Sequence, residues 1–187
     1  CQVAQVKAEL GLYEEGLEAA DEAVGYLTEF GDDNWLGAGY TVVAIVNNRM
    51  GCVQQALQAG EEAVRLCRRG GYPWGLASAI NELAMAHFLS ENYDAALQIQ
   101  EESIVLKRDS KAPRSLALSL ADKAATFAAM GDCQRAGACL RECMELLLAI
   151  GETTAYPHLY GIASHLLAER QKGEEAAMAL QRMHELI

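Results

Sequence analysis

The sequence repeats itself with a period of forty residues. One series of small residues begins at Ala4 and continues through Ala44, Ala84, Ala124 and Ser164. Three further series keep the same spacing and consist mainly of small residues; they begin at Gly16, Ala19 and Ala23. A fixed period of about 20–50 residues is typical of solenoids, in which each repeat buries its apolar face against its neighbours. This period limits the chain to a stacked array before any single element is assigned.

Each period contains the pattern of two helices joined by a short turn. Between about residues 74 and 89, apolar side chains recur every three or four positions, which places them on one helix face. A second helix is expected over residues 94–108. Pro73 and Pro113 suit a first helical turn, and Gly71 suits a helix end. The small residues are expected where the two helices of a pair cross closely.

Two segments carry a more specific resemblance. Residues 92–97 (Asn-Tyr-Asp-Ala-Ala-Leu) and 12–17 (Leu-Tyr-Glu-Glu-Gly-Leu) resemble the turn and second helix of the tetratricopeptide repeat, or TPR. The resemblance implies an all-α, right-handed α-solenoid of about five TPR-like helix-turn-helix repeats, with about ten helices. The repeats are expected at approximately 1–32, 33–71, 72–111, 112–151 and 152–187, as a single solenoid over 1–187. The period is longer than the roughly 34 residues of that family, and we expect longer second helices to absorb the difference.

Forty-residue repeats are also similar to the sensor arrays of certain large bacterial regulators. These are the STAND-type signal-transduction ATPases and the large LuxR-type and AfsR-type transcription regulators. Residues 75–84 and 95–103 carry this similarity, although kinesin-type adaptors also use repeats of about this length. The resemblance implies a cytoplasmic interaction or effector-sensing domain within a larger signalling protein.

We also expect the chain to be a segment of a longer polypeptide. The repeat register places Cys1 inside a first helix, and Leu186 and Ile187 end a second helix with no polar helix after them. Solenoids need polar end caps to stay in solution.

Composition excludes two classes of partner. The chain has 15 Lys and Arg against 26 Asp and Glu, a formal net charge of −11, so phosphate backbones should repel it. No apolar run approaches the roughly 18 residues that a membrane span needs. We therefore expect neither direct nucleic-acid binding nor a membrane span.

The sequence contains no recognisable catalytic or cofactor motif, so we expect no enzyme, no cofactor and no metal. The short motif Gly37-Ala-Gly39 lies inside a first helix and is expected to serve packing, not phosphate binding. The six cysteines lack zinc-site spacing and are expected to be reduced and mostly small core residues.

Two groups of metal-ligating residue types were weighed against this view. Cys139 and Cys143 lie four residues apart on one helix face, but their series are otherwise filled by core residues. His158, His165 and Glu169 share a helix stripe, yet a straight helix separates the two histidines by about 10 Å. That separation is too large for one ion. His87 is expected to be a core or near-core histidine with its hydrogen bonds satisfied.

The predicted binding site is a concave groove lined by the first helices. Its candidate residues are Ile45, Asn48, Arg49, Asn81, Glu82, Met85, Phe88, Leu89, Leu118, Asp122, His158 and His165. This surface mixes apolar and polar residues and lacks the Lys and Arg pairs that clamp a peptide carboxylate. An amphipathic helix, or another domain of the same polypeptide, is the partner that fits it.

Three functional classes remain open at this stage. The first is a protein-interaction or effector-sensing domain of a regulatory ATPase or transcription regulator. The second is a scaffold adaptor that binds a linear or helical peptide in the groove. The third and remotest is a metal-binding or enzymatic domain.

Overall fold

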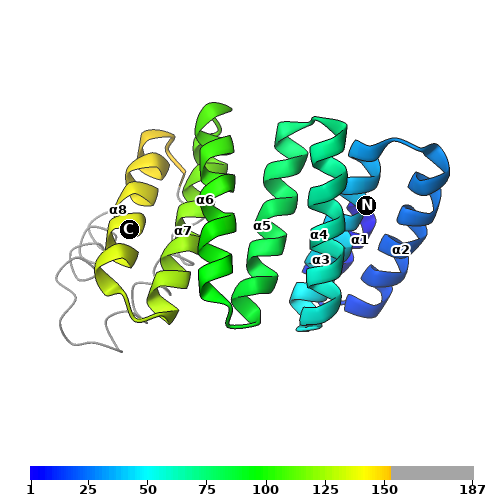
Figure 1. Cartoon of the computed structure of the whole chain (residues 1–187), viewed down its shortest axis with the longest axis horizontal. Helices are drawn as coiled ribbons and strands as arrows, with labels where there is room; N and C mark the ends of the chain where they lie inside the picture. The colour runs from blue at the N-terminus through cyan, green and yellow to red at the C-terminus, as the bar shows by residue number, and fades with distance from the viewer. Residues whose placement is uncertain (153–187) are drawn as a thin grey trace. The chain divides into compact units, whose positions relative to one another are not determined.

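The structure, a computed structural model, describes residues 1–152. Over this range it contains eight α-helices and no strand (Figure 1). The helices are α1 (Gln2–Glu9), α2 (Tyr13–Phe30), α3 (Asp33–Met50), α4 (Val53–Gly70), α5 (Pro73–Leu89), α6 (Tyr93–Asp109), α7 (Pro113–Ala129) and α8 (Cys133–Ala149). The all-α prediction is confirmed for the described residues. No helix among them is both long enough and apolar enough to span a membrane.

The number of helices differs from the expectation for the whole chain. We expected about ten helices in five repeats, whereas the described part has eight helices in four successive pairs. The difference arises because the expected repeat 152–187 lies, apart from Glu152, outside the described residues. The second helices have 17 or 18 residues.

The chain divides into two compact units, Cys1–Leu106 and Lys107–Ile187, and the division falls within α6. The expectation of one solenoid over 1–187 stays a prediction.

Local sequence explains where the helices begin and end. Pro73 and Pro113 occupy the first turns of α5 and α7, as predicted, where a missing N–H group costs nothing. Gly71 follows α4 with φ of 73°, a left-handed conformation that glycine adopts without strain. The carboxylate of Asp32 accepts hydrogen bonds from the main-chain N–H groups of Asn34 and Trp35, which caps the start of α3.

The small-residue series occupies the core. Ala4, Ala44, Ala84 and Ala124 are each no more than 2% exposed. In the first unit, a cluster of Ala4, Ala8, Ala20, Val42 and Val46 joins α1, α2 and α3. The close helix crossings that the series predicts are therefore present in the described residues.

The Gly37-Ala-Gly39 motif serves packing, as predicted. A Cβ atom on Gly37 would lie 2.6 Å from the Sγ atom of Cys67, so α3 and α4 approach too closely there for any side chain. A Cβ atom on Gly39 would lie 3.1 Å from a methyl carbon of Leu27 on α2. The two glycines thus let α3 lie close to both of its neighbouring second helices.

Candidate functional site

The first helices of the first unit are neighbours, because α3 contacts both α1 and α5. Two of the predicted groove residues meet directly across this contact. The Nδ2 atom of Asn48 on α3 donates to the main-chain oxygen of Glu82 on α5 at 3.0 Å and to its carboxylate Oε2 at 3.2 Å. Asn48 is only 9% exposed. This bridge fixes the positions of α3 and α5 relative to each other.

The oxygen of the Asn48 side-chain amide, in contrast to its nitrogen, has no hydrogen-bond partner in the described residues. This Oδ1 atom is buried. A buried acceptor without a donor is costly, by about 1–3 kcal/mol. At the α3–α5 contact, Asn48 therefore has a buried acceptor without a donor beside an amide donor whose position is fixed.

The apolar candidates on this face are only partly covered. Ile45 on α3 and Met85 on α5 are half-buried, and Leu89 at the end of α5 is exposed. Arg49 is also exposed and adds a positive charge next to Asn48. The face therefore offers an apolar surface with one cation.

Two predicted residues of α5 make contacts within their own repeat. The Oδ1 atom of Asn81 accepts a hydrogen bond from the hydroxyl of Ser103 on α6 at 2.7 Å. The half-buried ring of Phe88 packs against Tyr93 at the start of α6, with ring centroids 5.7 Å apart. Both side chains hold the α5–α6 pair together.

The remaining candidates lie in the second unit. Leu118 and Asp122 are half-buried on α7, and the main-chain oxygen of Asp122 accepts a hydrogen bond from the hydroxyl of Thr126. His158 and His165 lie outside the described residues. The twelve-residue site stays a prediction, of which the structure joins one pair, Asn48 and Glu82.

His87 departs from its expected role. It is half-buried, but its Nδ1 atom is buried without a hydrogen-bond partner in the described residues. The expectation that its hydrogen bonds would be satisfied is therefore wrong at this atom. Its place in the repeat, one period from Asn47 and from Phe127, predicts burial but cannot supply a partner.

All six cysteines have free thiols, but the prediction that most are core residues is wrong. Only Cys67 and Cys143 are buried; Cys1 is exposed, and Cys52, Cys133 and Cys139 are intermediate. Burial raises the pKa of the Cys67 thiol. Burial, together with the nearby carboxylate of Asp122, the Cys139 thiol and the carboxylate of Glu142, raises the pKa of Cys143 to about 12. The two core thiols are thus protonated at neutral pH and poor metal ligands.

No group of three metal-ligating side chains lies together in residues 1–152. His158, His165 and Glu169, which were considered as a possible metal site, lie outside this range.

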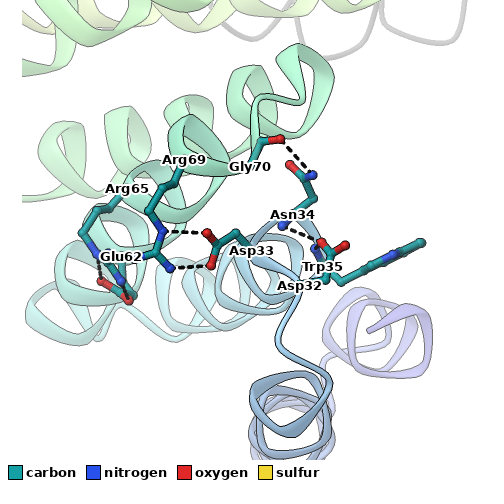
Figure 2. Close-up of polar contacts among 8 residues, drawn as sticks. All are labelled: Asp32, Asp33, Asn34, Trp35, Glu62, Arg65, Arg69 and Gly70. Carbon is teal, nitrogen blue, oxygen red and sulfur yellow. Dashed lines mark hydrogen bonds and ion pairs between the residues drawn. The ribbon is translucent and has the colours of Figure 1, made fainter.

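A polar cluster at the α3–α4 edge was not anticipated (Figure 2). The guanidinium of Arg69, near the end of α4, forms two hydrogen bonds with the carboxylate of Asp33, at the start of α3. This contact holds the pKa of Asp33 below its usual value. One turn earlier on α4, Arg65 pairs with Glu62 and lowers the pKa of that carboxyl. The Arg69–Asp33 pair ties the start of a first helix to the end of its own second helix, whereas the Arg65–Glu62 pair lies within α4.

A second missed feature is an ion pair that repeats with the period of the sequence. In the first unit, Arg68 on α4 pairs with Glu102 on α6, with oxygen–nitrogen distances of 2.7 and 2.8 Å. In the second unit, Arg108 on α6 pairs with Glu142 on α8. Both partners shift by forty residues from one pair to the next. This regularity was available in the sequence as recurrent Arg and Glu positions, but only contacts show that the two series pair.

A family model described as anaphase-promoting complex subunit 5 matches residues 39–81 and 84–154. Together these stretches make up more than half of the 187 residues. The chain belongs to this family. The matched residues include Asn48 and both periodic ion pairs, whereas Glu82 lies in the gap between the two matched stretches. A search of curated proteins gives no match.

Solved structures share the fold. The TPR-like repeats of a protein described as a kinesin light chain from Podosopora anserina match with a TM-score of 0.73 and 17% identity, over 99% of this chain and 93% of that one. The apo form of RapI matches with a TM-score of 0.80 and 15% identity, over 98% and 67%. A Rap protein complexed with competence and sporulation factor matches with a TM-score of 0.82 and 11% identity, over 97% and 51%. The chain therefore has a TPR-like repeat fold.

Proposed function

We propose that this chain is a non-catalytic TPR-like domain that binds a protein or peptide partner on the face of its first helices. The fold supports this proposal, because arrays of helical repeats present extended surfaces for binding. The similar Rap protein whose structure contains competence and sporulation factor supports it further.

The Asn48–Glu82 bridge is the observation that carries the proposal. It fixes two neighbouring first helices, so that a partner meets a preorganised surface and not two independent helices. The side chains around the bridge are the partly covered Ile45 and Met85 and the exposed Arg49 and Leu89. These residue types contribute apolar contact area and one cation, as an adaptable interface requires.

The chemistry of this face favours an amphipathic helix as the partner. Its apolar side would contact Ile45, Met85 and Leu89, and an acidic residue on its edge would pair with Arg49. The bound partner could be a separate protein or another domain of the same polypeptide. Such a helix would use the groove mode of recognition, in which anchors recur every three or four residues.

The larger setting that fits this domain is a STAND-type ATPase or a LuxR- or AfsR-type transcription regulator. Each repeat touches mainly its neighbours, so binding at one junction changes the packing that is passed along the stack. A partner that prefers one packing shifts the population towards it. In such a protein, effector binding would thereby control activity in an attached domain.

A peptide selection tests the proposed face. Helical peptides are selected for binding to the full 187-residue chain, and the affinity of the best binder is then measured for the Met85→Ala, Leu89→Ala double variant. Because both side chains would be buried by the partner, we expect affinity to fall tenfold or more, while circular dichroism stays unchanged. Phe88 is left intact because its ring packs against Tyr93.

Met130→Ala is the matched control, because Met130 is exposed in the turn after α7, in the other unit. It should leave the affinity unchanged. Equal affinity for the double variant and the wild-type chain would contradict the proposed face. Selection of several unrelated binders that all lose affinity in the double variant would favour the scaffold-adaptor alternative over a dedicated sensor.

A further inference from the structure

Helices α1 and α2 expose a face with large apolar side chains. Val3 and Val6 on α1 are 64% and 53% exposed, and Tyr26 on α2 is 67% exposed. Exposed apolar residues are normal when scattered, but a group on one face marks an interaction surface. The repeat register shows what kind of surface this is.

The first line of argument comes from α1 and α3. Val46, one period after Val6, is completely buried, and it packs in a cluster with Ala4 and Ala8 of the preceding first helix. Val43, one period after Val3, packs against the same cluster. These two positions of a first helix therefore contact the repeat before it. Val3 and Val6 occupy the same two positions but remain exposed.

The second helix leads to the same conclusion. Leu66, one period after Tyr26, is 1% exposed. Leu106, a further period on, packs against a cluster that includes Ala63 and Val64 of the preceding second helix, α4. In these later repeats the position is apolar and at least partly covered. At Tyr26 it is apolar and open.

Charge defines the chemistry of a neighbour that would cover this face. The carboxylate of Glu102 accepts a hydrogen bond from the guanidinium of Arg68 and forms an ion pair with it. Arg68 stands thirty-four residues earlier, on the second helix of the preceding repeat. Glu142 has the same relationship with Arg108. The carboxylate at this position of the repeat thus takes a guanidinium from the preceding second helix.

The carboxylate series has two earlier members, Glu62 and Glu22, and their partners in the structure lie on their own helices. Thr28 stands thirty-four residues before Glu62 and offers no cation, and Glu62 pairs with Arg65 on its own helix instead. Glu22 is exposed and accepts a hydrogen bond from the hydroxyl of Tyr26 at 3.3 Å. Glu22 is thus placed to receive a cation from outside α1 and α2.

We propose that the face formed by Val3, Val6, Glu22 and Tyr26 binds a TPR-like helix pair, stacked in register against α1 and α2. Its second helix carries an Arg or Lys that pairs with Glu22, as Arg68 pairs with Glu102. Its first helix covers Val3 and Val6. A second copy of the chain is disfavoured as the occupant because two chains of net charge −11 repel each other. This inference is independent of the partner-binding face proposed above.

An extended chain tests the proposal directly. A copy of residues 33–81 is placed before Gln2 of the 187-residue chain, in place of Cys1. This junction keeps the register, because Glu82 stands two periods after Gln2. The added Arg68 then stands thirty-four residues before Glu22, the separation seen in the Arg68–Glu102 pair. We expect the main-chain amides of α1 to exchange with deuterium at least tenfold more slowly than in the original chain.

Charge pairing is tested by a double-mutant cycle in the extended chain. Glu22→Gln and the Arg68→Gln change in the added copy should each lower the urea midpoint, and the two effects should not add. Glu22→Gln in the original chain is the matched control and should leave the midpoint unchanged. The same cycle on the native Arg68 and Glu102 gives the coupling free energy with which that of the new pair is compared.

A second extension guards against a junction that simply folds poorly. A copy of residues 73–121 placed before Gln2 keeps the same register and places its Arg108 thirty-four residues before Glu22. Slower exchange in α1 with either extension supports the proposal. Unchanged exchange, or failure of both extended chains to fold while the original chain folds, overturns it. Dimers of the original chain that Tyr26→Glu abolishes would also overturn it, because the occupant would then be a second copy.

Discussion

The side-chain amide of Asn34 donates a hydrogen bond to the main-chain oxygen of Gly70, with Nδ2 and the oxygen 3.1 Å apart (Figure 2). A Cβ atom on Gly70 would lie 2.2 Å from Oδ1 of the same amide. The last residue of α4 is therefore glycine because the amide at the start of α3 occupies the space of a side chain. This contact closes the open end of the α3–α4 pair.

Gly70→Ala is expected to show opposite effects in two backgrounds. In the wild-type chain the new methyl group displaces the Asn34 amide and breaks its hydrogen bond, which should cost about 1 kcal/mol of unfolding free energy. In an Asn34→Ala background the space is free, and the better helix former should stabilise the chain by up to about 1 kcal/mol. Urea unfolding of the four chains measures both effects. Equal effects in the two backgrounds would contradict this account.

Gly37 and Gly25 form a matched pair of helical glycines. Gly37→Ala places a methyl group against the Sγ and main-chain nitrogen of Cys67, and overpacking of this kind costs about 1–3 kcal/mol. Gly25 is exposed on α2 with open space around it, so Gly25→Ala should stabilise the chain by about 0.5–1 kcal/mol. Thermal unfolding of each variant gives the comparison. Two glycines that respond alike would argue against the close α3–α4 crossing.

Glu91 is a left-handed residue that interrupts a series of turn glycines, as Lys111 does in a second series. The φ of Glu91 is 60°, whereas Gly11, Gly51 and Gly131 occupy the corresponding turns. A left-handed conformation costs a residue other than glycine about 1–2 kcal/mol, so Glu91→Gly should stabilise the chain by roughly 0.5–1 kcal/mol after the greater chain entropy of glycine is subtracted.

The control for this change is Glu61→Gly, on an exposed position in the middle of α4. It should destabilise the chain by about 1 kcal/mol. The urea midpoint should therefore rise for Glu91→Gly and fall for Glu61→Gly, because only the left-handed turn position is relieved of strain by glycine. Midpoints that change in the same direction would contradict this account.

Cys143 should make the chain less stable at alkaline pH. The thiol has a pKa of about 12 in the folded chain, against an ordinary value of 9.0. Its stabilising contribution is therefore complete below pH 9 and is lost as the pH rises from 9 towards 12, by at most about 1.4 kcal/mol per pH unit.

Cys143→Ala provides the control, since alanine occupies the same position of the repeat at Ala23 and Ala63. Between pH 9 and 12, the free energy of unfolding of the wild-type chain should fall relative to that of this variant, by at most about 1.4 kcal/mol per pH unit. At neutral pH, iodoacetamide should modify the exposed Cys1 long before Cys143. Equal labelling rates for the two thiols would show that Cys143 is accessible.

Much of the fold could be predicted from particular residues. Pro73 and Pro113 mark helix starts because proline lacks the N–H group that a first turn does not use. Ala4 and Ala44 mark buried crossings because only small side chains fit where helices approach closely. These signals depend on the local sequence, so they can be interpreted without knowing which helix packs against them.

The candidate site was harder to predict. The pattern placed Asn48 and Asn81 on one type of surface, but Asn48 bridges to Glu82 whereas Asn81 bonds Ser103 of its own repeat. Helix periodicity predicts which side of the helix a residue faces. It does not predict the hydrogen-bond partner of a polar side chain, because that depends on the distance and angle to each possible partner. The position of His87 in the repeat likewise predicted burial and missed its unpaired Nδ1 atom.

The sequence by itself determined the period, the helical pairs and the positions of close packing, because these depend on residue size and backbone conformation at regular spacing. Only the tertiary structure decided which charges pair. Arg68 and Glu102 recur at the same forty-residue spacing as many other polar residues. Their pairing depends on two helices from different repeats being brought together, and that proximity is a property of the packed stack and not of either helix.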